Sequence, residues 1–127
     1  MVRFARAEGF TLVELLVVIA IVGILAGIAI PQIAAYRRRG YDTDIRANIK
    51  NASITQEAYF TDKETYSAIM ADLATWGFKQ NSTVKIGLAA SVTDFVVTGT
   101  ASAGCSANTG VWSFSSSSGV LTGNVCN

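Results

Sequence analysis

The side chains that can do acid–base or nucleophilic chemistry are few in this chain of 127 residues. It contains no histidine, and histidine is the commonest general base and completes the Ser–His and Cys–His nucleophile pairs. After Asp72 the only acidic side chain is Asp94, whereas a calcium site needs several carboxylate or carbonyl oxygens. We therefore predict no catalytic residues, no metal site and no cofactor, and a function other than that of an enzyme.

Both cysteines lie near the C-terminus. Cys105 and Cys126 have 20 residues between them, a spacing unlike CxxC, haem-attachment CxxCH or zinc-ribbon patterns. A disulfide is the favoured interpretation, and the loop it closes is worth about 3 kcal/mol in the chain-entropy model. Because disulfides persist in oxidising compartments, we expect this part of the chain in a periplasm or outside a cell.

One carboxylate stands at the start of a long apolar segment. No charged residue occurs from Leu15 to Tyr36, and a helix of about 20 residues crosses a hydrocarbon core of about 30 Å. Arg3 and Arg6 precede this segment as in a signal sequence, but the apolar run exceeds the roughly 7 to 15 residues of an ordinary cleaved signal. A carboxylate buried at this point, Glu14, needs a cation, and none lies in the next 22 residues.

The residues around this carboxylate form a specific motif. Residues 9–16, GFTLVELL, resemble without a gap the class III signal of type IV prepilins and pseudopilins. The resemblance implies that a membrane-bound prepilin peptidase cleaves between Gly9 and Phe10 on the cytoplasmic side and methylates the new amine of Phe10. It also implies that Glu14 neutralises the N-terminal amine of a neighbouring subunit during assembly. A single-pass anchor with a tolerated interfacial glutamate is the alternative.

The resemblance continues through Gly23, Gly27 and Pro31. In the filaments of this family, the stretch between these glycines and the proline can lose helical order. Pro31 removes a backbone donor, and each glycine costs about 1 kcal/mol in a helix. We therefore expect the helix to lose helical order here during assembly, with a simple kink in a membrane helix as the alternative.

A run of three arginines ends the apolar segment. Three arginines follow the apolar segment and two, Arg3 and Arg6, precede it. Under the positive-inside rule this difference weakly favours an orientation with the C-terminal side in the cytoplasm. The cleavage motif and the disulfide instead place the N-terminus in the cytoplasm, and we adopt that orientation. The arginines either face solvent and phospholipid headgroups or pair with acids of staggered neighbouring subunits. The residues concerned are Arg37, Arg38 and Arg39, with Asp42, Asp44 and Glu57 as the acids.

The rest of the chain predicts a small α+β domain. Apolar positions spaced as in an amphipathic helix continue the apolar helix to about Thr61, which gives a rod of about 52 residues and roughly 78 Å. Residues 61–65 break the pattern, and residues 68–76 form a short helix closed by Gly77. Alternation in residues 84–88, 95–98 and 112–114, with a turn at 115–119 leading into 120–121, predicts three or four antiparallel strands.

The expected fold class is therefore α+β. A long N-terminal helix packs on one face of a small antiparallel sheet, with the C-terminal disulfide pinning the last hairpin, as in the ladle fold of pilins. The expected organisation is a cleaved leader at residues 1–9, an apolar transmembrane and assembly helix at 10–36, and a globular domain at 37–127. Four aromatic residues are expected in the core: Trp76, Phe78, Phe95 and Trp112.

The most specific function that the resemblance implies is that of the major subunit of a type IVa pilus. Such a subunit is anchored once in the inner membrane and then polymerises by bundling its apolar helices into a surface fimbrium. Its implied partners are other copies of itself, the inner membrane, prepilin peptidase, the pilus assembly platform and minor pilins. Motility, adhesion and DNA uptake are the roles such filaments have. The net charge of +1 gives no basic field for a nucleic-acid site.

Two other functions stay open. A pseudopilin of a type II secretion system shares the same first 30 or so residues and builds a short periplasmic piston. A narrower hypothesis is an electron-conducting pilus, since the aromatic residues resemble those of pilins proposed to conduct electrons; ordinary packing of a helix bundle is its alternative. The aromatic residues concerned are Phe10, Tyr36, Tyr41, Tyr59, Phe60 and Tyr66.

Overall fold

The computed structural model describes residues 9–127. The predicted leader, apart from Gly9, and its two arginines lie outside the described residues. The chain divides into two compact units, of which one ends at Ala35 and the other comprises Tyr36–Asn127. The second unit holds the disulfide and the whole sheet, and the two units are described separately below.

Helix α1 comprises Leu12–Lys63. Its bounds lie within two residues of the prediction at both ends. The helix is assigned without interruption through Gly23, Gly27 and Pro31. Since the expected loss of helical order concerns the assembled filament, it stays a prediction.

Helix α2 is short, Met70–Thr75; it begins two residues later and ends one residue earlier than predicted, directly before the predicted closure at Gly77. Gly77 has a φ of 93°, a left-handed conformation that glycine adopts without strain. The backbone N–H of Phe78 donates to the carbonyl of Leu73 at 2.9 Å, and that of Gly77 donates to the carbonyl of Ala74 at 3.2 Å. This pair of bonds is a Schellman closure, which satisfies carbonyl groups at the helix end.

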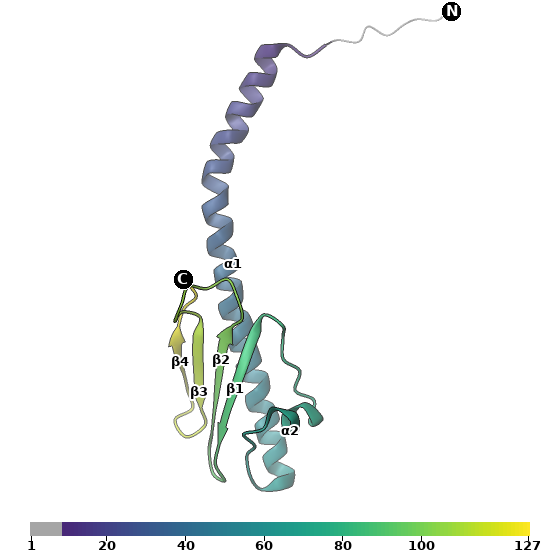
Figure 1. The fold of residues 1–127 in the computed structure, drawn as a ribbon, viewed down its shortest axis with the longest axis vertical. Helices are drawn as coiled ribbons and strands as arrows, with labels where there is room; N and C mark the ends of the chain where they lie inside the picture. Colours follow the sequence, from purple (N-terminus) through teal and green to yellow (C-terminus); the bar gives the residue numbers. More distant parts are fainter. Residues whose placement is uncertain (1–8) are drawn as a thin grey trace, which may run out of the picture. The chain divides into compact units, whose positions relative to one another are not determined.

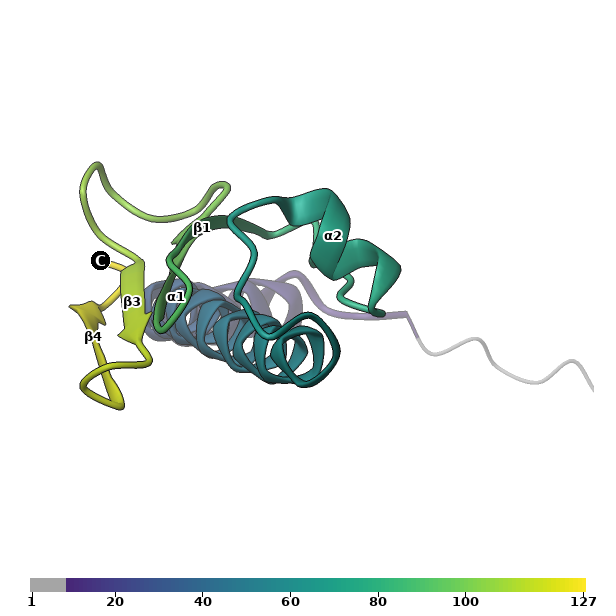
Figure 2. The same cartoon turned by 90° about the horizontal axis from the view of Figure 1, so that it is seen from below.

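Four antiparallel strands follow in simple succession (Figure 1). They are β1 (Val84–Ala90), β2 (Phe95–Ala101), β3 (Val111–Ser115) and β4 (Val120–Asn124). Each strand pairs with the next, so the spatial order is β1-β2-β3-β4. The sheet lies against α1 of the Tyr36–Asn127 unit, with α2 beside the β1 end (Figure 2), and the predicted fold class is confirmed.

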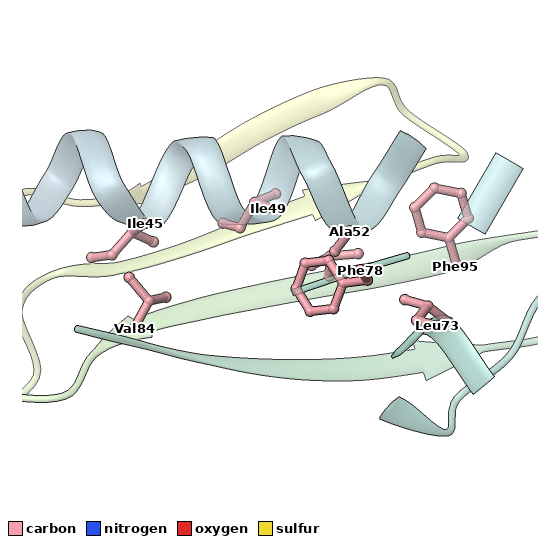
Figure 3. Close-up of a cluster of buried hydrophobic side chains, with 8 residues drawn as sticks. Ile45, Ile49, Ala52, Leu73, Phe78, Val84 and Phe95 are labelled. Carbon is pink, nitrogen blue, oxygen red and sulfur yellow. The ribbon is translucent and has the colours of Figure 1, made fainter. Parts of the chain in front are cut away.

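The core lies between α1 and the inner face of the sheet. Ile45, Ile49 and Ala52 are at most 2% exposed and recur at helical spacing on the face of α1 that meets the sheet (Figure 3). Phe95 and Val97 alternate inward on β2 and are at most 1% exposed. Phe78, Val84 and Leu73 complete the cluster.

A glycine in β2 sets how closely the helix approaches the sheet. A Cβ added to Gly99 would lie 2.7 Å from Cγ2 of Ile45 and 3.0 Å from two side-chain carbons of Ile49. Real Cβ contacts essentially never reach the shorter of these distances. The absence of a side chain at Gly99 therefore allows the two isoleucines to pack directly on the backbone of β2.

The four predicted core aromatic residues divide into two groups. Phe78 and Phe95 are buried, and Trp112 packs partly buried against the core. The prediction is wrong for Trp76, which is 39% exposed. It is the last residue before the Gly77 turn, and its ring packs edge-on against Tyr59 at a centroid distance of 5.9 Å instead of entering the core.

Candidate site for processing and assembly

The start of α1 is closed by a reciprocal pair of hydrogen bonds between Thr11 and Glu14. The Thr11 hydroxyl accepts from the backbone N–H of Glu14 at 3.2 Å, and Oε2 of Glu14 accepts from the backbone N–H of Thr11 at 3.0 Å. The same Oε2 accepts from the Thr11 hydroxyl at 2.8 Å. This arrangement is a capping box, which satisfies backbone donors that the first turn of a helix leaves free. The Thr-x-x-Glu spacing was available in the sequence as a helix-start signal, beside the role implied by the family resemblance.

The first part of α1 leaves its apolar side chains uncovered. Leu12 is 78% exposed, Ile24 68% and Ile30 69%, and no residue of the apolar window is buried inside the structure. That window has a mean hydropathy of 2.9, enough for a membrane span by length and composition. A Cβ placed on Gly23 or Gly27 would meet nothing within 4 Å. A surface this apolar needs lipid or other helices to cover it.

The three arginines after this segment have no carboxylate partner within the described residues, where the Lys63–Asp62 contact of 2.9 Å is the only ion pair. Arg39 lies with its guanidinium carbon 5.8 Å from the centre of the Tyr36 ring, within the range of a cation–π contact. Arg37 and Arg39 are exposed, so their charge is available to a partner.

Two of the predicted pairing acids already accept hydrogen bonds from polar groups of their own chain. Asp44 accepts from the Thr83 hydroxyl at 3.0 Å, and the Glu57 carboxylate accepts from the Tyr66 hydroxyl at 3.3 Å. Burial, the charge of Glu57 and this hydrogen bond all raise the pKa of Tyr66 above its usual value. A single hydroxyl leaves most acceptor positions of a carboxylate free. The prediction that these acids pair with arginines of a neighbouring subunit stays a prediction.

The third acid, Asp42, is buried in the Tyr36–Asn127 unit and only 8% exposed. Its Oδ1 accepts from Nε1 of Trp112 at 3.0 Å, and the backbone N–H of Cys126 lies 3.0 Å from both carboxylate oxygens. The guanidinium carbon of Arg46 lies 3.8 Å from the centre of the Trp112 ring. Asp42 therefore joins α1 to β3 and to the C-terminal segment. The sequence carried a signal for this role, because Asp42 precedes Ile45 by three residues and so falls on the buried face of the helix.

The predicted disulfide between Cys105 and Cys126 is confirmed, with a Cα–Cα distance of 5.0 Å. It joins the loop between β2 and β3 to the segment after β4. The backbone N–H of Ser106 also donates to the carbonyl of Asn127 at 2.8 Å. The C-terminal segment is thus held at Cys126 by the disulfide and at Asn127 by this backbone hydrogen bond.

Four aromatic rings form a row inside the Tyr36–Asn127 unit. Phe60 stacks on Tyr66 at a centroid distance of 4.6 Å, and Tyr66 lies 4.8 Å from Phe95. The ring of Phe114 continues the row at 6.1 Å from Phe95. The row runs from the end of α1 into the core, and such pairs stabilise a core beyond the area they bury.

Only two of the six aromatics proposed as a conducting path belong to this row. The ring pairs of the described residues place Tyr59 against Trp76 instead, and Tyr41 lies close against the backbone of Gly104. Phe10 is 84% exposed and Tyr36 is 66% exposed. Electron conduction through these residues stays a prediction about the filament.

Comparisons with known proteins agree with the N-terminal motif. Residues 5–30 match the family model described as the prokaryotic N-terminal methylation motif. The chain is 39% identical over 100 residues to the type IV wide pilus major component PilA4 of Thermus thermophilus, a match covering 79% of this chain and 71% of that protein.

Two further relatives match shorter stretches. The type IV major pilin protein PilA of Myxococcus xanthus is 42% identical over 62 residues, which is 49% of this chain and 28% of that pilin. A fimbrial protein of Pseudomonas aeruginosa is 62% identical over 32 residues, covering 25% of this chain and 21% of its own length. Together with the apolar N-terminal helix, the sheet and the C-terminal disulfide, these matches show that the chain belongs to the type IV pilin family and is a structural subunit of a pilus.

Proposed function

We propose that the chain is the major subunit of a type IV pilus filament. Prepilin peptidase cleaves it between Gly9 and Phe10 and methylates the amine of Phe10. The processed subunit is held in the inner membrane with its N-terminus in the cytoplasm and then passes to the pilus assembly platform. In the filament it contacts other copies of itself and minor pilins.

The observation that carries this proposal is the uncovered apolar part of α1. Nearly all its side chains are exposed in the single chain, and they lie on every side of the helix. A helix apolar all round is covered either by lipid or by other helices. Bundling with the same segment of other subunits replaces lipid by protein, so one surface serves both the membrane-bound and the assembled state.

The role of Glu14 in assembly follows from what its carboxylate already contacts. Oε2 carries both hydrogen bonds to Thr11, which leaves Oε1 without a partner among the described residues. A carboxylate has about four acceptor positions. Oε1 can therefore accept a hydrogen bond from the freed amine of a neighbouring Phe10, while Oε2 keeps its hydrogen bonds to Thr11. The positive amine then neutralises the buried carboxylate.

The processing and the filament are tested together on the source cells. Material sheared from the cell surface is examined by electron microscopy and by intact mass. We expect filaments built from a chain that begins at methylated Phe10 and is two hydrogens lighter for the disulfide. A processed chain that stays in the envelope and forms no surface filaments supports the alternative, a type II secretion pseudopilin or a minor pilin. An unprocessed N-terminus contradicts the proposal.

Variants at two positions separate the two tasks of Glu14. Glu14→Gln keeps an oxygen acceptor for the Thr11 backbone but removes the charge, so we expect processed subunits in the membrane and few or no filaments. Thr11→Val keeps the charge but removes the hydroxyl from the cap, at a cost of about 1 kcal/mol of local helix stability, so filaments still form. Filaments in normal number from Glu14→Gln would contradict the proposed pairing with an amine.

A further inference from the structure

Charge is segregated along the Tyr36–Asn127 unit. Residues 36–50 carry five cations and two acids, and one of these acids is the buried Asp42. Residues 51–72 carry four acids and one cation, and that cation, Lys63, pairs with Asp62. The first part of this unit's helix is therefore basic, and the stretch from Asn51 to Asp72 is acidic. Two copies placed side by side in the same orientation repel, whereas a stagger that puts the basic part of one against the acidic stretch of the next attracts.

The basic part of α1 borders an apolar groove. The groove has a volume of 360 Å³ and lies between α1 and the inner face of the β3–β4 half of the sheet. Its apolar wall comes from Ile49, Ile54, Phe114 and Leu121. Ile54 is 58% exposed and Leu121 is 37% exposed, although both sit where the helix and the sheet converge. Exposed apolar side chains that surround a groove are typical of a surface that binds a partner.

Two cations stand on the rim of this groove, Arg46 and Lys50, one helical turn apart. Arg46 is partly engaged by the ring of Trp112. Lys50 is exposed and forms no ion pair in the part of the chain that the structure describes. A partner suited to the groove thus brings an apolar side chain with carboxylates beside it.

The chain itself carries a surface of this kind in the loop between α1 and α2. Ile69 is 60% exposed at the end of this loop. The exposed acid Glu64 begins the loop, and Asp72, in the first turn of α2, accepts a hydrogen bond from the Ser67 hydroxyl at 2.6 Å. The loop is held in place by Gln56, which is fully buried and bonds through its amide to both the N–H and the carbonyl of Ser67. Ile69 is therefore presented from an anchored loop, which lowers the entropy lost on docking.

We propose that the groove of one subunit receives the α1–α2 loop of a second copy, with Ile69 against the apolar wall and the Glu64 carboxylate beside Arg46 and Lys50. This inference rests on the proposed filament function. The groove and the loop are different surfaces of the same chain, so the contact is heterologous and leaves one groove and one loop free at the two ends of any oligomer. A contact of this type propagates into a filament instead of closing into a dimer.

Cysteine pairs test the contact in filaments made by the source cells. Ser53→Cys places a thiol on the groove lining, at a residue whose hydroxyl bonds only to the Ile49 carbonyl within α1. Ile69→Cys places the second thiol on the loop. The matched control combines Ser53→Cys with Val92→Cys, because Val92 is 65% exposed and lies two residues from an acid, Asp94, in the β1–β2 turn.

After mild oxidation of sheared filaments, we expect the Ser53→Cys/Ile69→Cys chain to give a ladder of covalent multimers on non-reducing gels. The control pair should give mostly monomer, and each single variant none above background. A ladder from the Val92 control in place of the Ile69 pair would overturn the inference and identify the β1–β2 turn as the occupant. Filaments that assemble without any ladder would also overturn it while leaving the proposed function intact.

Charge exchange gives a second test that needs no engineered thiol. Lys50→Glu alone and Glu64→Lys alone each place like charges together, so we expect several-fold fewer filaments from either variant, with a larger loss at low salt. The double exchange restores the pairing and with it the filament yield. Single variants that both assemble normally, or a double variant no better than either, contradict the contact. If wild-type cells show no filaments of this chain, it is the proposed function that fails.

Discussion

Asp42 is a buried acid whose loss we expect to be costly in the Tyr36–Asn127 unit. Its carboxylate is 8% exposed and accepts the indole N–H of Trp112 and the backbone N–H of Cys126, each at 3.0 Å. Hydrogen bonds to charged groups contribute about 1.5–3 kcal/mol each, and a buried donor left without an acceptor costs about 1–3 kcal/mol. Relief from burying the carboxylate itself offsets part of this loss. We therefore expect Asp42→Ala to lower the free energy of unfolding by about 3 kcal/mol.

The measurement is urea unfolding of the full chain in detergent micelles, followed by tryptophan fluorescence. Asp44→Ala is the matched control, since Asp44 lies two residues away on the same helix and accepts one hydroxyl at 3.0 Å. Its loss should cost about 0.5–1.5 kcal/mol. Asp42→Asn keeps one oxygen acceptor and should fall between the two. In thermal unfolding this difference of about 1.5–2.5 kcal/mol should separate the midpoints of the alanine variants by about 6–20 °C.

Two outcomes would refute this reasoning. If Asp42→Ala and Asp44→Ala lower the free energy of unfolding equally, the Asp42 contacts carry no special weight. If Asp42→Asn is as damaging as the alanine variant, the charge matters more than the two hydrogen bonds. A change in the denaturant slope would mean instead that the variant alters the compactness of the folded or unfolded state.

Further predictions concern the helix–sheet contact, the disulfide and a tyrosine. Gly99→Ala should cost about 1–3 kcal/mol in urea unfolding because its Cβ overpacks the core, whereas Gly87→Ala, whose Cβ would meet nothing closer than 3.9 Å, should be near neutral. Reduction of the disulfide should lower the free energy of unfolding by about 3 kcal/mol, measured as a shift in the urea midpoint with and without reductant. Tyr66 should ionise above the usual pKa for tyrosine, near 10, in ultraviolet absorbance titration, and Glu57→Gln should reduce the shift. Because the folded pKa is raised, the stability that Tyr66 contributes is present below about pH 10 and is lost as the pH rises through the folded pKa.

The elements of the fold were predictable where a local pattern determined them. The spacing of Ile45, Ile49 and Ala52 identified the buried face of α1, and Gly77 identified the end of α2. The lengths of the strands were harder to predict from the sequence, because β1 and β2 extend as far as their pairing with each other allows. Val84 pairs with Ala101 at one end of the ladder and Ala90 pairs with Phe95 at the other. Pairing between distant residues is a tertiary property that single-strand alternation does not encode.

Residue type alone did not predict burial at two positions, where the place of the residue in the fold determines its exposure. Tryptophan is usually well buried, yet Trp76 lies at the end of a short helix, packs against Tyr59 and stays 39% exposed, while Phe78, just after the Gly77 turn, enters the core. Aspartate is rarely buried without a partner, yet Asp42 lies on the sheet-facing side of α1. The helical spacing indicated burial, but the partners that satisfy Asp42 lie 70 and 84 residues further along the chain, and no local pattern identifies them.

The two acids at the beginning and middle of α1, Glu14 and Asp42, differ in how far their own chain satisfies their carboxylates. Asp42 accepts hydrogen bonds on both oxygens from its own chain, and its burial is stabilised within the subunit. Glu14 accepts on Oε2 alone, from the residue three before it. A neutral residue at position 14, such as glutamine, can still cap the first turn of the helix, but it carries no charge to attract an amine. The capping box therefore holds the Glu14 side chain at the first turn, and Oε1, which has no partner among the described residues, is the atom through which the proposed pairing with the amine of a neighbouring subunit would act.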